Sequence, residues 1–302
     1  MNLRDLEYLV AVNDLRHFRK AAERCFVSQP TLSGQVRKLE DELGITLIER
    51  NNRKVIFTNA GEAITEQARR VLMEVSGVKD LARSFSEPMS GPIHVGLIPT
   101  VAPYLLPRIV KPIQQQFSDL EMFFVEDQTE RLLKKLNDGE LDCVILALLP
   151  RMDNYGQFKL YKEPLELVIP EKHDWNDRKI VHFNELKGKK ILMLEDGHCL
   201  RDQAMEYCFV AGAEEDNSFR ATSLETLRFM VGAGTGITLL PQLALPKARK
   251  KDGLIYLKID QPLPQRQIVM LFRSQSERKG CFEKLSEQIT KSIDAELASY
   301  DI

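Results

Sequence analysis

The sequence has 302 residues, of which 43% are hydrophobic and 28% are charged, and its formal net charge is −2. This length suggests two or three domains, and the composition is that of a soluble globular protein. A net charge so close to zero excludes a uniformly basic nucleic-acid-binding protein, so any such surface must be a local patch.

The hydropathy pattern argues against export and membrane insertion. Charges at Arg4, Asp5 and Glu7 do not fit a secretory signal. The longest apolar run, VILALLP from Val144, has the length of a core strand and falls short of the ~18 residues of a membrane span. We therefore expect a cytoplasmic protein with no membrane partner. Its five cysteines are too few for a disulfide framework, and cytosolic thiols stay reduced unless they are redox-active.

The N-terminal residues predict three short helices. Residues 5–18 and 19–25 have apolar side chains at helical spacing, and a tight FVSQ link leads to a third helix over 30–43. Ser28 can cap this third helix, and Gly44 can end it. Two short helices with a tight link, followed by a helix with a polar face, are typical of a helix-turn-helix.

A predicted hairpin follows the third helix, with two strands around an Asn-Asn turn in ITLIERNNRKVIFT. In a helix-turn-helix protein the recognition helix lies in the major groove, and a hairpin of this kind forms a wing on the DNA backbone. A helical bundle with ordinary surface charges is the alternative. The expected DNA contacts are Arg4, Ser28, Gln29, Pro30, Thr31, Ser33, Gln35, Arg37, Lys38, Arg50, Arg53 and Lys54.

A long helix with almost no breaker is expected next, over residues 59–87. Its apolar residues recur at alternating spacings of four and three, which is the pattern of a coiled-coil seam. This pattern between two domains favours a dimerisation helix, because helix-turn-helix proteins read two half-sites as dimers. A helix packed on its own domain is the alternative. The seam consists of Ile64, Ala68, Val71, Val75, Val78, Ala82 and Phe85.

From Ile93 onward, strand patterns alternate with helical patterns, which predicts parallel α/β sheets. There are too many strands for one small sheet, so we expect two Rossmann-like subdomains with a ligand cleft, arranged as in periplasmic binding proteins. The fold class is thus an α/β regulatory domain over 88–302, preceded by an all-α winged helix-turn-helix domain over 1–58 and the long dimerisation helix. Subdomain I covers about 91–161 plus 268–302, and subdomain II covers about 162–267.

Four segments carry a family resemblance. AAERCFVSQPTLSGQVRKLEDELGITLIERNNRKVIFTNAG resembles the N-terminal domain of LysR-type transcriptional regulators. MSGPIHVGLIPTVAPYLLP, LDCVILAL and LEDGHCLRDQAMEYCFVAGAEEDNSFRATSLETLRFMV resemble the members of that family that sense hydrogen peroxide. The resemblance covers essentially the whole chain, and HCLRDQ with its second cysteine is the specific part. It implies a DNA-binding activator rather than an enzyme.

Cys199 stands at the predicted start of a helix, in the motif GHCLRDQ. A helix N-terminus carries roughly half a positive charge, and His198 and Arg201 bring donors and positive charge close in sequence. All three favour a thiolate, which attacks the O–O bond of a peroxide to give sulfenic acid. On the residues alone, a buried structural cysteine is the alternative.

Cys208 shares an apolar stripe with Leu200, Ala204 and Ala211, so we expect it to face the core and to be inert at rest. If the stretch is helical, the Cα atoms of Cys199 and Cys208 lie about 13 Å apart, whereas a disulfide needs about 7 Å or less. The two thiols are therefore unrelated, or they are the halves of a switch that requires the helix to unwind. The cysteine and histidine spacings do not fit a zinc site, so we expect no metal and no cofactor.

The resemblance implies that Cys199 is peroxidatic and Cys208 resolving, and that their reversible disulfide re-registers a homotetramer on DNA to control oxidative-stress defence genes. The implied partners are a double-stranded DNA operator, hydrogen peroxide, RNA polymerase and a thiol reductant. The alternative is a LysR-type regulator that responds to a small-molecule effector in the subdomain cleft, with the cysteines incidental.

The resemblance also implies a peroxide pocket made of Thr100, Thr129, His198, Arg201, Asp202 and Arg266. From the residues alone, Thr100 and Thr129 are expected to be helix caps at the carboxyl ends of strands, where open α/β sheets bind ligands. The remaining cysteines are predicted to be structural, with Cys281 partly exposed on the final helix; they are Cys25, Cys143 and Cys281.

Overall fold

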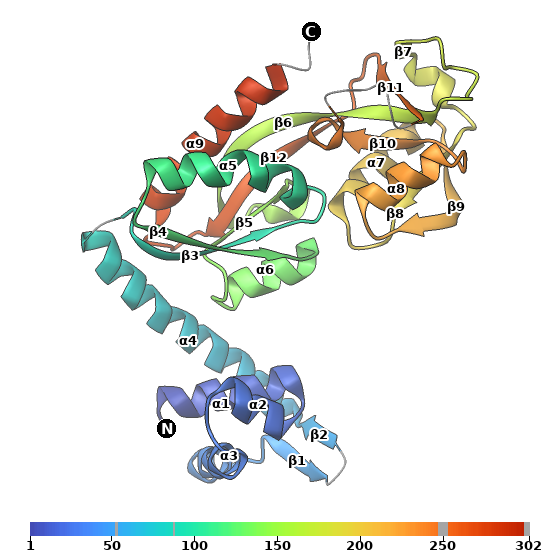
Figure 1. Ribbon diagram of the computed structural model, residues 1–302. Coiled ribbons are helices and arrows are strands. Elements are labelled where there is room, and N and C mark those ends of the chain that lie inside the picture. The colour runs from blue at the N-terminus through green and yellow to red at the C-terminus, as the bar shows by residue number, and fades with distance from the viewer. Residues whose placement is uncertain (52–53, 87, 247–252, 299–302) are drawn as a thin grey trace. The chain divides into compact units, whose positions relative to one another are not determined.

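The computed structural model describes residues 1–51, 54–86, 88–246 and 253–298 (Figure 1). Its contacts divide the chain into two compact units: Met1–Ala82 with Asn137–Gly139, and Arg83–Leu136 with Glu140–Ile302. Over the described ranges, no helix has both the length and the apolar character needed to cross a membrane.

The first unit contains the predicted winged helix-turn-helix. Ser28 caps α3 by accepting a hydrogen bond from the Thr31 amide at 3.3 Å, and Gly44 ends α3 with a left-handed φ of 69°. The wing strands β1 and β2 pair antiparallel, as predicted, but Asn51 belongs to β1 and pairs with Lys54, while Asn52 of the predicted turn lies outside the described residues. The elements of this unit are α1 (Leu3–Leu15), α2 (Phe18–Arg24), α3 (Gln29–Leu43), β1 (Ile48–Asn51) and β2 (Lys54–Phe57).

Helix α4 (Asn59–Ser86) is the long helix predicted from the heptad pattern. The first residues of its seam pack against α1 and the core of the same unit: Ile64, Ala68 and Val71. Farther along, Val78 is 67% exposed and Ala82 is exposed, while the side chain of Phe85 lies outside the described residues. Packing on its own domain therefore explains the first part of the seam, and a dimer contact stays a prediction for the rest.

The second unit is an α/β domain around a sheet with the strand order β4-β3-β5-β12-β6-β11-β7, and β10 pairs with β6. β3 is parallel to β4 and β5, but β6 and β12 run antiparallel to each other and to their other neighbours in this sheet. The strands are β3 (Gly91–Leu97), β4 (Leu120–Glu126), β5 (Cys143–Ala147), β6 (Tyr155–Pro170), β7 (Ile180–Val181), β10 (Thr238–Pro241), β11 (Leu254–Ile259) and β12 (Gln265–Arg273).

The predicted parallel pairing thus holds for β3 with β4 and β5 but not for β6 and β12, an antiparallel pair through which the chain passes between the two halves of this unit. Helices flank both halves in Figure 1, and β8 and β9 form a separate parallel pair beside α7 and α8. The helices and the second sheet are α5 (Ala102–Gln116), α6 (Thr129–Asn137), α7 (Cys199–Val210), α8 (Leu224–Gly232), α9 (Lys279–Ala298), β8 (Lys190–Leu194) and β9 (Glu214–Ala221), with short 3-10 turns η1 (Pro150–Met152), η2 (Phe183–Leu186) and η3 (Gln242–Ala244).

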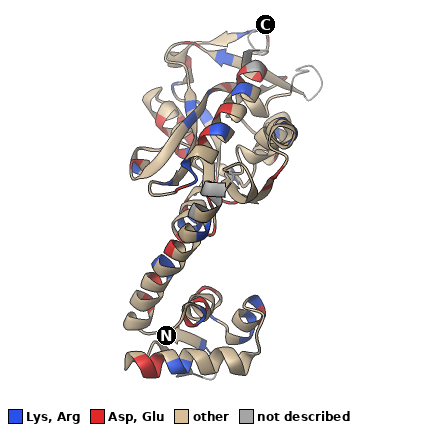
Figure 2. Cartoon of the chain, turned by 90° about the vertical axis from the view of Figure 1, so that its left-hand side faces the viewer, with Lys and Arg blue, Asp and Glu red and all other residues tan. Residues whose placement is uncertain are grey.

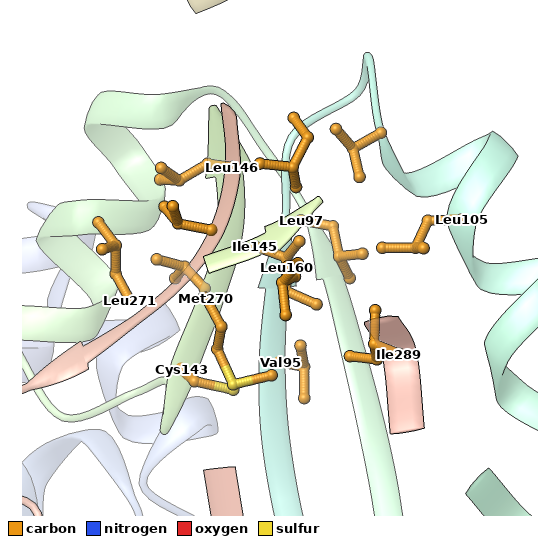
Figure 3. Close-up of a cluster of buried hydrophobic side chains, with 14 of the residues drawn as sticks. Val95, Leu97, Leu105, Cys143, Ile145, Leu146, Leu160, Met270, Leu271 and Ile289 are labelled. Carbon is orange, nitrogen blue, oxygen red and sulfur yellow. The ribbon is translucent and has the colours of Figure 1, made fainter. Parts of the chain in front are cut away.

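Two hydrophobic cores lie in this unit. The first is made by side chains from 93–161 and 268–293, joined by Cys199 and Leu243, and part of it is drawn in Figure 3. The second is made by side chains from 165–259. Cys143 belongs to the first core, as predicted, but so does Cys281, which is buried and not partly exposed because α9 turns that face onto the sheet. The subdomain boundaries themselves stay a prediction.

Candidate redox site and DNA-binding surface

Helix α7 begins at Cys199 and continues through Cys208 to Val210, so the helix predicted from the sequence is present. The turn before it depends on Gly197, which has a φ of 95° and whose added Cβ would lie 2.9 Å from the Gln128 side chain. The helical rise places the Cα atoms of the two cysteines about 13 Å apart, beyond disulfide range.

The two cysteines of α7 belong to different hydrophobic cores. Cys199 is 3% exposed and packs in the first core, whereas Cys208 is 2% exposed and packs in the second. Both thiols are free. Burial raises the pKa of the Cys208 thiol to about 12, so this thiol is protonated at neutral pH. Cys208 faces the core together with Leu200, Ala204 and Ala211, as the stripe predicted.

The positive charges expected near Cys199 are arranged differently from the prediction. Burial lowers the pKa of His198 below its usual value, so the imidazole is neutral at pH 7 and carries no positive charge there. Arg201 donates to both carboxylate oxygens of Glu215 at 2.8 and 2.9 Å, and Asp196 lies 3.4 Å from its Nε. The Arg201 charge is therefore paired with carboxylates, which leaves the N-terminus of α7 as the positive element at Cys199.

Thr100 and Thr129 are both buried, and neither acts as a helix cap. The Thr100 hydroxyl accepts a hydrogen bond from Arg266 at 2.8 Å, and Val101, which occupies the N-cap position before α5, makes no side-chain cap. The Thr129 hydroxyl has no hydrogen-bond partner within the described structure. The cap interpretation is wrong because the two hydroxyls turn into the protein and not toward the free amides of a helix end.

Arg266 lies at the centre of a fully buried polar network. It donates to the Thr100 carbonyl at 2.9 Å and pairs with Glu163 at 2.7 Å, and Glu163 also accepts from the Leu243 amide at 3.0 Å. Glu163 is not among the site residues predicted from the sequence. Its signal was a carboxylate inside the apolar strand YKEPLELVIP, where an acidic residue requires a buried partner.

The residues predicted for the peroxide pocket do not all lie close to one another. Asp202 is exposed on α7, and Arg201 is engaged with Glu215 on β9. In contrast, Thr100 and Arg266 are bonded to each other, and Cys199 packs in the core that also contains the β3–α5 turn. Across the described residues, no group of three or more His, Cys, Asp or Glu side chains is placed to hold a metal ion.

The polar face predicted on α3 is accessible. Ser33 and Gln35 are half-buried. The Ser28 hydroxyl is hydrogen-bonded to the Thr31 amide, as the helix cap, and to the Thr31 hydroxyl. The exposed residues predicted to contact DNA are Arg4, Ser28, Gln29, Pro30, Thr31, Arg37, Lys38 and Lys54. Arg53 and the Arg50 side chain lie outside the described residues. Figure 2 shows the basic and acidic residues of the chain, and the roles of these contacts stay a prediction.

Comparison with known proteins agrees with this arrangement. Residues 3–62 match the family of bacterial regulatory helix-turn-helix proteins of the lysR type, and residues 86–293 match the LysR substrate binding domain. The chain is 56% identical over 294 residues to the DNA-binding transcriptional dual regulator OxyR of Escherichia coli K12, covering 97% of this chain and 96% of the relative.

Two solved structures of OxyR are also similar. The oxidised form has 53% sequence identity and the reduced form 50%; each gives a TM-score of 0.65 and covers 70% of this chain and 99% of the other. The two family matches thus follow one another along the chain, the helix-turn-helix first and the α/β domain after it. The chain belongs to the OxyR branch of the LysR family of bacterial transcriptional regulators.

Proposed function

We propose that this protein regulates transcription in response to hydrogen peroxide, with Cys199 as the reacting thiol and a reversible Cys199–Cys208 disulfide as the signal. The observation that carries the proposal is a single helix, α7, with two free thiols at its ends that are buried in different cores. The relatives named as OxyR and solved in oxidised and reduced forms support it. As a member of a regulator family, the chain is not an enzyme.

The proposed chemistry has two balanced steps. The Cys199 sulfur attacks one peroxide oxygen, the O–O bond breaks, and the second oxygen leaves as water, which gives a sulfenic acid. The Cys208 sulfur then attacks the Cys199 sulfur, the S–O bond breaks, and a second water leaves with the Cys208 proton. The protein loses two electrons to the peroxide. A thiol reductant returns two electrons and two protons to restore both thiols.

Disulfide closure requires a change of shape. The two sulfurs cannot meet while α7 is helical, because about 13 Å separates their Cα atoms. Closure therefore needs Cys199 to leave the first core, or Cys208 to leave the second, with loss of part of α7. The Arg201–Glu215 pair joins α7 to β9, so unwinding α7 would also release this strand. The Cys199–Cys208 disulfide would thereby hold α7 in its unwound state.

We assign the peroxide pocket to Thr100, Thr129, His198 and Arg266. The Thr129 hydroxyl supports this assignment, because a buried hydroxyl without a partner is costly unless a small polar ligand satisfies it. The Thr100 hydroxyl accepts from Arg266 and keeps its own proton to donate, and a neutral His198 can donate or accept. Arg201 is assigned to holding α7 on β9, and Asp202 is left outside the pocket because it is exposed.

The proposed setting is the bacterial cytoplasm, where thiol reductants reset the switch. The proposed partners are a double-stranded operator bound through α3 and the wing, three further copies of the chain in a homotetramer, and RNA polymerase. The exposed end of the α4 seam, around Val78, supports a contact between copies.

Mass spectrometry of the full chain treated with stoichiometric peroxide tests the proposal. We expect a Cys199–Cys208 disulfide in wild type and a trapped Cys199 sulfenic acid in Cys208→Ser, with operator binding altered only in wild type. A Cys208→Ser variant that switched transcription normally would contradict the disulfide. Cys199 oxidation no faster than that of a free thiol would favour a small-molecule effector in place of peroxide.

A further inference from the structure

Near its end, α7 contacts two other segments of the unit through the side chain of Tyr207. Its hydroxyl donates to the Pro262 carbonyl at 2.8 Å, and its ring meets Phe183 edge to face at 5.0 Å between centroids. Phe183 is itself anchored, because its amide donates to Asp260 at 2.8 Å. Tyr207 thus connects α7 to two separate segments, η2 and the 260–264 loop.

The residues beyond Cys208 contribute little to this attachment. Phe209 and Val210 are 79% and 72% exposed, so their side chains do not tie the helix end to the core. Burial also raises the pKa of the Tyr207 hydroxyl well above its usual value, which keeps the proton that it donates. The attachment of Tyr207 directly precedes Cys208, so it holds the turn that keeps this thiol in the second core.

The space beside Tyr207 allows this attachment to open. A groove of about 460 Å³ runs between the outer face of α7 and the 262–267 loop, and it is lined by Gln203, Glu206, Tyr207, Val210, Phe183 and Leu263 among others. Tyr207 lines this groove together with Phe183 and Pro262, so open space lies beside its contacts with these two residues.

We propose that Tyr207 is a positioning residue for disulfide closure: its contacts with Pro262 and Phe183 hold Cys208 away from Cys199 until the end of α7 unwinds. This inference rests on the proposed function. The contacts must be broken when Cys208 approaches the oxidised Cys199 sulfur, so they raise the barrier to the second chemical step. They do not touch Cys199, so the first step, attack on peroxide, is independent of them.

The test is Tyr207→Phe in the full chain, which removes the hydroxyl and keeps the ring. Loss of one hydrogen bond of ordinary net strength should make closure of the disulfide about threefold to tenfold faster. The reduction potential of the disulfide should fall by about 14–30 mV, which is the same factor expressed as an equilibrium. In the Cys208→Ser background, Tyr207→Phe should leave the rate of Cys199 sulfenic acid formation unchanged.

Two further variants control the result. Phe209→Ala truncates the exposed ring on the other side of Cys208 and should leave closure at the wild-type rate. Phe183→Leu keeps the Tyr207 hydroxyl bond but loses the ring contact, so it should also accelerate closure, and it serves if Tyr207→Phe does not fold. Wild-type closure in both Tyr207→Phe and Phe183→Leu would overturn the inference and leave the proposed function intact.

Equal acceleration of both chemical steps would also overturn it, because that result means a general loosening of α7. Absence of any disulfide in wild type, by contrast, would defeat the proposed function itself.

Discussion

The two ends of α7 hold their cysteines by different physical means. At the start, Cys199 lies at a helix N-terminus, and the neighbouring Arg201 is tied to β9 by an ion pair with Glu215. At the end, Cys208 is sealed in an apolar core, and the adjacent Tyr207 is tied to a loop by one hydrogen bond and one ring contact. A thiol that reacts with peroxide needs nearby positive charge to favour its thiolate. A resolving thiol needs to stay protonated until the first step is complete.

The two environments suit the two roles proposed for thiols of the same chemical type on one helix. Burial alone raises the pKa of Cys208 to about 12, so the thiol cannot attack until the helix end opens. In the proposed pocket, peroxide would meet Cys199 at the other end of α7, in the first core and away from Cys208. The order of the two chemical steps would therefore follow from the environments at the two ends.

The largest expected effect comes from removing each thiol in turn. Cys199→Ser should abolish peroxide-dependent oxidation of α7, because no other thiol in this helix stands at a helix N-terminus. Cys208→Ser should keep sulfenic acid formation at Cys199 but yield no internal disulfide. Labelling of sulfenic acid with a dimedone probe, followed by peptide mapping, distinguishes the two variants. Equal loss of sulfenic acid in both would remove the difference between the two ends.

A second test separates the chemistry at the Cys199 end from its packing. Thr129→Val replaces a buried hydroxyl that has no partner with a methyl group of the same shape, so the free energy of unfolding should stay equal or rise by about 1 kcal/mol. The rate of Cys199 oxidation should nevertheless fall roughly tenfold, because the hydroxyl would bond the peroxide. Urea unfolding and stopped-flow oxidation give the two quantities.

The matched control for Thr129 is Thr238, whose buried hydroxyl donates to the Leu192 carbonyl at 2.8 Å. Thr238→Val should cost about 1–3 kcal/mol in the free energy of unfolding, because it leaves that carbonyl unpaired. It should not slow Cys199 oxidation. If both variants slowed oxidation equally, the Thr129 hydroxyl would have no special place in the pocket.

The ionic tie at the start of α7 should have a moderate effect on stability. Glu215→Gln keeps the side-chain size but removes the carboxylate that pairs with Arg201, and both side chains are only 12% exposed. The cost in the free energy of unfolding should be about 1–3 kcal/mol. Arg220→Gln, on the more exposed arm of the same cluster, should cost less than about 1 kcal/mol. Equal losses of stability in the two variants would mean that the Arg201–Glu215 pair does not hold the start of α7 on β9.

A last test, which needs pH values far from neutral, concerns Cys208. Its pKa is about 12 in the folded protein against an ordinary value of 9.0. A thiol whose pKa rises on folding stabilises the folded state below the ordinary value, and this stabilisation is lost as pH rises toward the folded value. The free energy of unfolding should thus fall between pH 9 and 12 by about 1.4 kcal/mol per pH unit from this group.

Cys208→Ser lacks this titration, so its free energy of unfolding should decline less steeply above pH 9 than that of the wild type. Urea unfolding at pH 8, 9 and 10 measures both slopes under conditions that keep the other thiols reduced. Parallel slopes would mean that Cys208 is not sealed in the folded state.

Local patterns in the chain were enough for its elements and for the position of the two thiols. The Ser28 cap and the Gly44 terminus are short-range signals that appear where they were predicted, and the predicted hairpin strands pair as expected. The stripe that buries Cys208 follows from helical periodicity alone. Such features depend on neighbours within a few residues, so they can be predicted from the residue types and their spacing.

Long-range packing determined the rest of the site. Arg201 looked like a partner of Cys199 in sequence, but it pairs with Glu215, fourteen positions later on a different strand. Thr100 looked like a helix cap, but Arg266 reaches it across 166 positions, held by Glu163. Charged side chains bond to whatever the fold brings within about 3 Å, and spacing along the chain does not reveal those partners.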